Sequence, residues 1–387
     1  MAPRFVDSPL RLVTPGFASP LTDVVIELDH LRRLRLVGDT PVAVFQQLKQ
    51  IFHTLESLGS ARIEGNHTTL ADYIESKIDS SGQPSDPIRE INNIERAMDY
   101  VERAVEAGAR ITEQFIRELH LLTVSDLVRE GDAHPGQYRP GNVQINAAEH
   151  LPPETNQVPA YMQELTDFIN REDAPKYDLI KMALAHHRFL WIHPFGNGNG
   201  RTVRLLSYAM LIKYGFNVQL GGRVLNPTAV FCNDRNTYYE NLSRADTGTD
   251  DGLEAWCLYV LSGIRDELQK VDRITQYDYL RDRILRPALA HSRDRKWLND
   301  AEAAVLGMAI NKGEFKAADI DRVLPELTTR QRTYLITKLS NQHMICPVRE
   351  GARSYTISFT NNYLLRGVIH ALENEGFVQP FVKSARA

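Results

Sequence analysis

The chain has 387 residues, long enough for two or three domains with hydrophobic cores of their own. Its 43% hydrophobic and 24% charged content is typical of soluble globular proteins, and no apolar run approaches the ~20 residues that span a bilayer. The net charge of −4 gives no whole-chain argument for binding nucleic acid. Three scattered cysteines and an N-terminus without a long apolar stretch lead us to expect a cytoplasmic protein with no membrane contact.

Helical periodicity dominates the chain after its proline-rich start. The first forty residues lack a clear period, and we interpret them as an arm. Further on, the Gly- and Pro-rich residues 134–154 surround the β-prone Val143-Gln144-Ile145 and predict a loop with a small hairpin. Elsewhere, apolar residues recur at three- and four-residue steps and predict helices over 41–64, 88–107, 112–128, 158–170, 178–191, 201–214, 227–242 and 252–274.

The residues from Lys296 onward predict a separate small domain. Helices are expected over 301–310, 316–324 and 328–341, followed by strands over 345–348 and 354–359. Three helices followed by a two-stranded wing resemble a winged helix, which binds either DNA or protein. The basic residues that would meet DNA phosphates lie on the third helix and on the wing: Arg330, Arg332, Lys338, Arg349 and Arg353.

The stretch HPFGNGNGRTVR, residues 193–204, predicts an anion site at the start of a helix. Its three glycines expose backbone N–H groups at the positive end of the helix dipole. Arg201 and Arg204 share a face of that helix and can reach the outer phosphates of a triphosphate. His193 is the nearby group that can titrate near neutral pH. Together these residues suggest phosphoryl or nucleotidyl transfer.

Other interpretations of this stretch fit less well. A Walker A loop would need a following Gly-Lys-Ser/Thr, and a dinucleotide-binding loop would follow a strand, whereas here a helix precedes the glycines. His186, His187 and His193 suggest zinc, but no helical His-Glu-x-x-His pattern or nearby cysteine accompanies them. We therefore interpret His186 and His187 as packing residues.

The stretch also resembles the signature of Fic-domain proteins, which mostly transfer AMP from ATP to a hydroxyl of a target protein. GQYRPGNVQI, residues 136–145, resembles the flap of that family, and Tyr238-Tyr239 resembles the tyrosines near its adenine pocket. The resemblance covers roughly residues 41–274. It implies a mainly α protein: the Fic helical fold with a β-hairpin flap, joined here to the small winged helix-turn-helix domain. The matching residues are His193, Pro194, Phe195, Gly198, Asn199, Gly200, Arg201 and Arg204.

The resemblance implies a role for each matching residue. His193 would be the general base that takes the proton from the attacking hydroxyl, and Phe195 would anchor the loop. Asn197 stands where the family usually has an Asp or Glu that holds Mg²⁺, and its neutral amide makes it a weak candidate ligand. Gly198, Asn199 and Gly200 would line the anion hole. Arg201 and Arg204 would bind the phosphates of the nucleotide, Arg204 the γ-phosphate. Tyr238 and Tyr239 would lie near the adenine.

Ser60-Ala61-Arg62-Ile63-Glu64-Gly65 resembles the inhibitory motif of the same family. Glu64 lies in the last turn of its helix, where the dipole disfavours a carboxylate, so it should seek a cation. The resemblance implies that Arg204 is this cation and is thereby withdrawn from the γ-phosphate, while Ser60 positions the helix. The alternative is an ordinary exposed glutamate near a helix end.

These observations predict four segments: an arm and helices with the inhibitory motif (1–110), the Fic core (111–276), a linker helix (277–295), and the winged-helix domain with a tail (296–387). The expected function is a protein adenylyltransferase that uses ATP and Mg²⁺, modifies a Tyr, Ser or Thr hydroxyl of a target protein, and is inhibited by Glu64. A de-AMPylating enzyme and a nucleotide-sensing DNA-binding regulator are the alternatives. Because family members often pair, a homodimer is also an open expectation.

Overall fold

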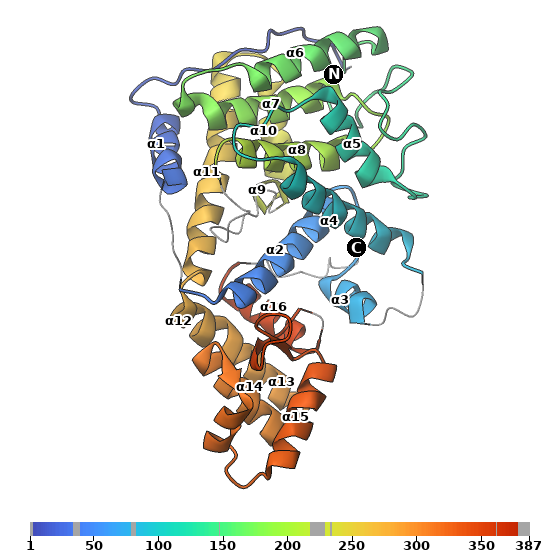
Figure 1. The fold of residues 1–387 in the computed structure, drawn as a ribbon. Coiled ribbons are helices and arrows are strands. Elements are labelled where there is room, and N and C mark those ends of the chain that lie inside the picture. The colour runs from blue at the N-terminus through green and yellow to red at the C-terminus, as the bar shows by residue number, and fades with distance from the viewer. Residues whose placement is uncertain are drawn as a thin grey trace. The chain divides into compact units, whose positions relative to one another are not determined.

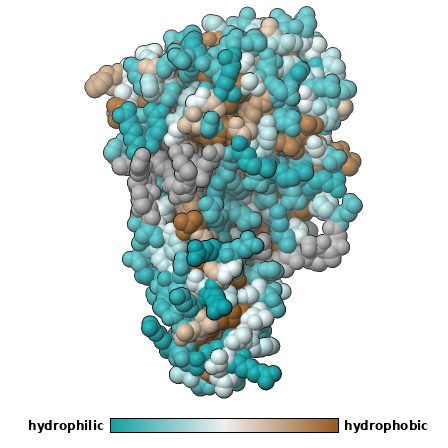
Figure 2. Space-filling view, viewed as in Figure 1, coloured by the Kyte–Doolittle hydropathy of each residue, from teal (hydrophilic) through white to brown (hydrophobic). Residues whose placement is uncertain are grey.

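The computed structural model describes residues 3–33, 39–78, 83–146, 148–216, 229–232, 234–360 and 362–377. Helices make up most of these ranges, and the strands are few and short (Figure 1). The chain divides into two compact units, the first formed by 1–35, 56–68 and 84–269 and the second by 36–55, 69–83 and 270–387. Within the described ranges, no helix is long and apolar enough to cross a membrane. The surface seen in Figure 2 is mostly hydrophilic, with apolar residues scattered over it.

The first unit is built around α8 (Asn199–Lys213), which packs against α4, α5 and α7 (Figure 1). Almost every residue of α7 and α8 is buried, so the turn between these two helices is fixed from several sides. This confirms the helices predicted over 112–128, 158–170, 178–191 and 201–214. The neighbouring helices are α4 (Asp86–Ala104), α5 (Glu113–Val124), α6 (Val158–Asn170) and α7 (Asp178–Ile192).

Local sequence signals explain where these helices begin and end. The Thr112 side chain accepts a hydrogen bond from the Phe115 N–H at 3.1 Å and caps α5. Helix α7 ends at His193, which adopts the left-handed conformation with φ 50°, because the following Pro194 cannot continue the helix. Helix α8 then begins after Gly198, another left-handed residue with φ 74°.

The remaining helices of the chain show where the sequence patterns were misleading. The arm predicted for the first forty residues contains α1 (Pro20–Arg33), a helix that was missed because the segment before it is rich in proline. The start of the helix predicted over 227–242 lies outside the described residues, and the rest forms α9 (Ala229–Cys232) and α10 (Arg235–Ala245). The helices predicted over 41–64 and 252–274 are confirmed as α2 (Val42–Ile63) and α11 (Asp250–Ile274).

The predicted hairpin around Val143–Ile145 is wrong: none of the described residues within 134–154 belongs to a strand. Side chains hold this flap as a loop instead. Thr155 donates its backbone N–H to Asn142 Oδ1 at 2.8 Å, and its hydroxyl contacts the carbonyl oxygens of Arg139 and Gly141. These contacts use backbone groups that a hairpin ladder would need, so they favour the loop.

The second unit contains a three-stranded antiparallel sheet in the order β1-β3-β2. Its strands are β1 (Phe315–Lys316), β2 (Ile345–Pro347) and β3 (Ser354–Ile357), of which β1 was not predicted. The predicted helix over 316–324 is a 3₁₀ helix, Ala317–Arg322. The α-helices of this unit are α3 (Leu70–Ile78), α12 (Tyr277–Tyr279), α13 (Arg286–Asp294), α14 (Asp300–Lys312), α15 (Thr329–Asn341) and α16 (Leu364–Asn374), with a π-helix over Leu280–Leu285.

Helix α15 begins with the predicted capping box, in which Thr328 and Gln331 bond each other's backbone. The three helical segments and the two strands expected of a winged helix occur in the predicted order, with the unexpected β1 between the first two helical segments. The winged helix itself stays a prediction. Two of the basic residues expected to face DNA are used within the unit, because Arg332 pairs with Asp321 and Lys338 pairs with Glu302. Arg330, Arg349 and Arg353 are exposed.

Candidate active site

The glycine-rich stretch forms the turn between α7 and α8, and other side chains closely approach two of its glycines. At Gly198, a Cβ atom would lie 2.6 Å from Val124 Cγ1, and the positive φ adds strain for any larger residue. At Gly200, a Cβ atom would lie 2.2 Å from Oε1 of Glu64. The backbone of the turn is therefore closely approached from both sides, and on the Gly200 side the approaching group is an anion.

Asn199 and Phe195 keep the turn in shape. The buried Asn199 side chain accepts the Phe195 N–H at 3.0 Å and donates to the Phe195 carbonyl oxygen at 2.9 Å. Phe195 is fully buried, as expected of an anchor. The Asn199 side chain thus holds the loop, and only the Asn199 backbone remains for an anion.

His120 on α5 contacts the same loop and was not predicted. Its ring stacks on Phe195 with the centroids 3.7 Å apart and the planes 1° from parallel. Nδ1 accepts the Gly136 N–H at 2.9 Å, so the ring proton is on Nε2, which donates to the Asn197 carbonyl oxygen at 3.1 Å. Burial lowers the pKa of His120 to about 4, which keeps the ring neutral. His120 therefore ties the flap to the loop.

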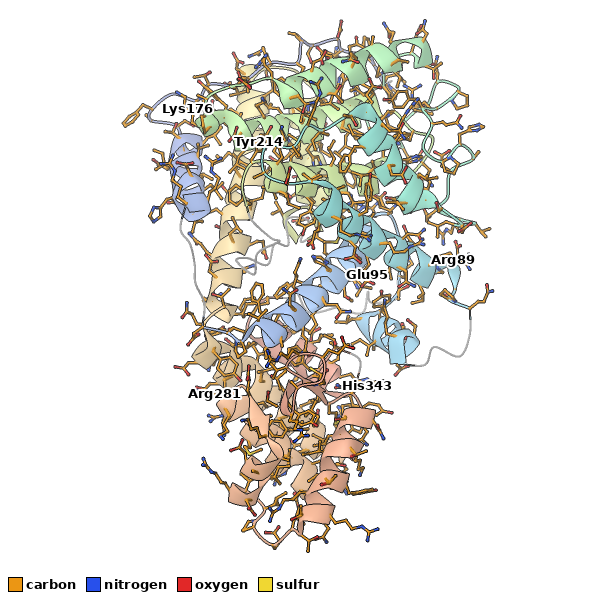
Figure 3. The ribbon with its side chains drawn as sticks, viewed as in Figure 1. Arg89, Glu95, Lys176, Tyr214, Arg281 and His343 are labelled. Carbon is orange, nitrogen blue, oxygen red and sulfur yellow. The ribbon has the colours of Figure 1, made fainter. Side chains whose placement is uncertain are left out.

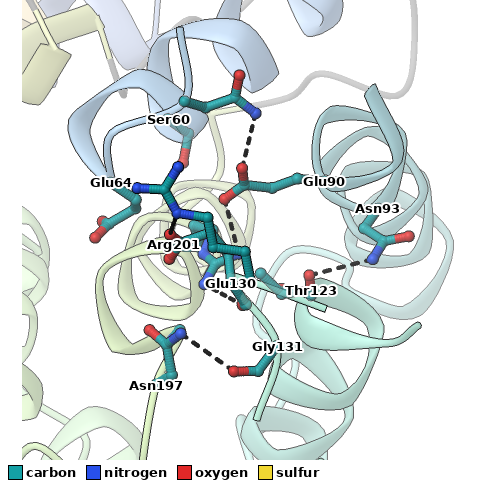
Figure 4. Close-up of polar contacts among 12 residues, drawn as sticks. Ser60, Glu64, Glu90, Asn93, Thr123, Glu130, Gly131, Asn197 and Arg201 are labelled. Atoms are coloured by element: carbon teal, nitrogen blue, oxygen red, sulfur yellow. Dashed lines mark hydrogen bonds and ion pairs between the residues drawn. The ribbon is translucent and has the colours of Figure 1, made fainter. Parts of the chain in front are cut away.

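Asn197 is held by hydrogen bonds on every side. Asp132 accepts its backbone N–H at 2.8 Å, and its side-chain Nδ2 donates to the Gly131 carbonyl oxygen at 3.1 Å (Figure 4). Its Oδ1 accepts the Gly198 N–H at 2.7 Å. A carboxylate at position 197 lacks the hydrogen that the Gly131 carbonyl accepts. An asparagine is thus suited to this position as a structural clamp.

The residues around Asn197 do not form a metal site. Within the part of the chain that the structure describes, no group of three or more His, Cys, Asp or Glu side chains is placed to hold a metal ion. The amide oxygen of Asn197 already accepts a hydrogen bond, and Asp132 accepts two backbone N–H groups. The donor set therefore does not fit a metal that the protein itself holds.

His193 is neutral at pH 7. Burial lowers its pKa to about 4, and the Arg139 guanidinium acts in the same direction. Arg139 also holds the backbone at this residue. Its side-chain Nε donates to the His193 carbonyl oxygen, and its backbone N–H donates to the Pro194 carbonyl oxygen, both at 2.9 Å. A neutral imidazole can accept a proton, as a general base must. Sequence reasoning missed Arg139, although it lies within the flap motif.

Glu64 occupies the anion side of the turn, as the inhibitory motif predicted. Its Oε1 lies 2.7 Å from Nη2 of Arg204, and Ser60 accepts hydrogen bonds from the same guanidinium through its hydroxyl at 2.9 Å and its carbonyl at 3.0 Å. Burial alone would raise the pKa of Glu64, but the charges of Arg204 and Arg201 outweigh it and hold the pKa below its usual value. An ionised carboxylate therefore lies against Gly200 at the start of α8.

Arg201 is buried and engaged, rather than open to a ligand. Its Nη1 lies 2.8 Å from Oε1 of Glu90 on α4, and its Nη2 donates to the Glu130 carbonyl oxygen at 2.8 Å (Figure 4). Asn66 donates to the other oxygen of Glu90 at 2.8 Å. Neither Glu90 nor Asn66 was predicted.

The two tyrosines expected near an adenine differ in exposure. Tyr238 is buried, and its hydroxyl contacts Nε2 of His186 at 2.9 Å. Nδ1 of His186 contacts the Ser207 hydroxyl at 2.8 Å. Tyr239 has 43% of its surface exposed. The Arg235 guanidinium lies over the exposed Tyr239 ring, 5.5 Å from its centroid, while Tyr238 and His186 form part of the core.

The loop and the helices around it are similar to those of Fic-domain proteins. The Fic/DOC family model matches residues 110–211, so this part of the chain is a Fic domain. The fold is similar to that of a Fic family protein from Desulfovibrio desulfuricans G20, with a TM-score of 0.53 and 23% identity over 89% of this chain and 98% of the other. A Fic domain-containing signaling protein from Bacteroides thetaiotaomicron gives a TM-score of 0.51 at 20% identity, over 66% of this chain and 97% of the other.

Among named relatives, the chain is similar to the protein adenylyltransferase Fic of Nematostella vectensis. The two are 32% identical over 197 residues, which cover 49% of this chain and 42% of the relative. The protein of the same name from Drosophila willistoni is 30% identical over 241 residues, 58% of this chain and 45% of the relative. The chain thus aligns with less than half the length of these relatives.

Proposed function

We propose that this protein is an adenylyltransferase that transfers AMP from ATP to a hydroxyl of a target protein and is restrained by Glu64. The observation that carries the proposal is the carboxylate of Glu64, which is bound against Gly200 and Arg204 at the start of α8. A position that stabilises one carboxylate also suits a phosphate group. The names of the relatives with 30% and 32% identity support the same activity.

The chemistry follows from the residues of the turn. Neutral His193 takes the proton of the target hydroxyl, whose oxygen attacks the α-phosphorus of ATP. The bond from that phosphorus to the oxygen bridging the α- and β-phosphates breaks, and pyrophosphate leaves. The N–H groups of the first turn of α8 stabilise the charge that develops on the phosphate oxygens.

The restraint acts through Arg204. While its guanidinium is bonded to Glu64 and Ser60, it is not available to the γ-phosphate. We therefore expect the native chain to bind ATP in a pose that reacts slowly, and removal of the Glu64 carboxylate to release the arginine.

In this proposal Mg²⁺ enters the site bound to the triphosphate. Because Asn197 and Asp132 are both engaged by hydrogen bonds, the phosphates and water would supply the oxygen ligands of the ion. A target protein with a Tyr, Ser or Thr hydroxyl is the proposed partner. We also expect the predicted C-terminal winged helix to bind DNA and two copies of the chain to form a homodimer.

Transfer of label from ATP tests the function. The Glu64→Gly variant is incubated with lysate proteins and ATP that carries a radioactive phosphorus at either the α or the γ position. We expect protein bands labelled from α-labelled ATP only, because AMP retains the α-phosphorus. Label from the γ position would indicate a phosphotransferase, and label from neither would contradict the proposal.

Two controls make this test specific. The double variant Glu64→Gly with His193→Ala should give no bands, since it lacks the base. A lysate protein that is first labelled and then loses AMP in the presence of the native chain would instead indicate a de-AMPylating enzyme.

A further inference from the structure

Both arginines of the turn are paired with carboxylates that reach them from other helices. Glu64 follows the end of α2 and forms an ion pair with Arg204. Glu90 lies on α4 and forms an ion pair with Arg201. We propose that Glu90 is a specificity-determining residue of this site, because its carboxylate competes with the β-phosphate of a nucleotide for Arg201. This inference rests on the proposed function, in which Arg204 meets the γ-phosphate.

Arg201 is already bonded to a carboxylate with which a phosphate would compete. Its side chain is completely buried, and both terminal nitrogens are bonded, one to Glu90 and the other to the Glu130 carbonyl oxygen. The side chain of Glu90 is also only 3% exposed. Nε of Arg201 is buried and has no hydrogen-bond partner among the described residues. A phosphate that binds Nη1 would compete with the Glu90 carboxylate, which resembles it in charge.

The position of Glu90 on α4 is itself fixed. Arg89 and Glu95 on the same helix are labelled in Figure 3, and Glu90 lies between them in the sequence. Asn66, only two residues after Glu64, donates to the second carboxylate oxygen of Glu90 and to the Pro87 carbonyl oxygen. The segment that carries the inhibitory glutamate therefore also holds the partner of the second arginine.

The electrostatic surroundings allow this exchange. Burial raises the pKa of Glu90, and the carboxylates of Glu130 and Glu64 add to the rise, while Arg201 and Asn66 act against it. When Arg201 turns toward a phosphate, Glu90 loses its main stabilising charge and can take up a proton. The site then avoids an unpaired buried carboxylate, which would otherwise oppose binding.

The test compares the affinities for AMP, ADP and ATP, measured by calorimetry without any target protein. In the Glu64→Gly background, Glu90→Gln removes the competing charge and keeps the size of the side chain. We expect the preference for ADP over AMP to rise about tenfold, the range of a charge-assisted contact. The additional preference for ATP over ADP, which reports on Arg204, should stay the same.

Glu130→Gln is the matched control. It removes the same charge close to Arg201, but the Glu130 side chain lies toward Arg129 at 3.6 Å, and its backbone carbonyl is unchanged. A general loss of negative charge would raise the ADP preference equally in both variants, and this result would overturn the proposal. Glu90→Asp, which keeps the charge but shortens the reach, replaces Glu90→Gln if the latter does not fold, and should also raise the ADP preference.

The remaining outcomes separate this inference from the proposed function. If the Glu64→Gly parent binds ADP and ATP but Glu90→Gln leaves the ADP preference unchanged, Glu90 does not compete and the proposed function stands. If the preference falls, Glu90 orients Arg201 for the phosphate, and the proposal is overturned. If the parent variant binds no nucleotide, the proposed function fails, and this inference fails with it.

Discussion

Removing the Glu64 carboxylate should change how strongly the γ-phosphate contributes to nucleotide binding. Glu64 and Arg204 are joined at 2.7 Å, and their side chains are 24% and 2% exposed. A hydrogen bond between charged groups contributes ~1.5–3 kcal/mol. Because Glu64 is partly exposed and Ser60 keeps its two contacts with Arg204, we take ~2 kcal/mol as the energy that ATP must overcome in the native chain.

This energy corresponds to about a 30-fold change in a binding constant. The ratio of the dissociation constants of ADP and ATP measures the γ-phosphate contribution, and calorimetry gives both constants. We expect this ratio to be near one in the native chain and about 30-fold higher in Glu64→Gly. The isosteric Glu64→Gln, which keeps an oxygen for Arg204 but no charge, should fall between them.

An equal ratio in the native chain and in Glu64→Gly would refute the argument that Glu64 withholds Arg204 from the γ-phosphate. The stricter control adds Arg204→Ala to Glu64→Gly. Since both substitutions act through one guanidinium, the added change should return the ratio to its native value.

Further predictions concern the turn itself. In the Glu64→Gly background, His193→Ala should reduce the rate of transfer by ~10²–10⁴-fold and leave ADP affinity almost unchanged; unaltered transfer would remove His193 from the mechanism. With His193 present, transfer should hold its plateau on acidification and decline only near the lowered His193 pKa of about 4, because the neutral ring is the base; a decline centred near pH 6.5 would contradict this. Asn197→Asp should lower the free energy of unfolding by ~1–3 kcal/mol in urea titrations, since the Gly131 carbonyl loses its donor; unchanged stability would mean that this bond contributes nothing. Gly200→Ala should displace the Glu64 carboxylate and so change the ratio of the ADP and ATP dissociation constants, because the new methyl group would lie 2.2 Å from Glu64 Oε1; an unchanged ratio would mean that the contact tolerates the methyl group.

The sequence predicted well those parts of the site that depend on local signals. The turn at 193–204 and its position between two helices follow from residue types at fixed spacing. The contact between Glu64 and Arg204 was implied by the resemblance to the family's inhibitory motif, and the structure contains it. The helices with strong periodicity were also predicted, whereas α1 was missed because the segment before it is rich in proline. The hairpin was wrong because contacts of Arg139 and Thr155 decide the conformation of the flap, and the β propensity of three residues does not.

The partners of Arg201 and Asn197 could not be predicted, for a physical reason. Glu90 is one of several acidic residues on an amphipathic helix, and only the packing of α4 against α8 brings it to Arg201, 111 residues away. The Gly131 carbonyl that binds Asn197 carries no sequence signal at all, since every residue has a carbonyl. Long-range polar pairs of this kind depend on the tertiary structure.

The bare backbone at Gly200 has a consequence for how this protein can evolve. A Cβ atom at this position would lie 2.2 Å from Oε1 of Glu64, so any larger residue would require the Glu64 carboxylate to move. A larger residue at position 200 would therefore disturb the Glu64–Arg204 contact and the start of α8 together. A single substitution at Glu64, by contrast, would remove this contact and leave the turn intact. Variation in how tightly such chains are regulated should accordingly accumulate around the end of α2, while the turn before α8 stays nearly invariant among related sequences.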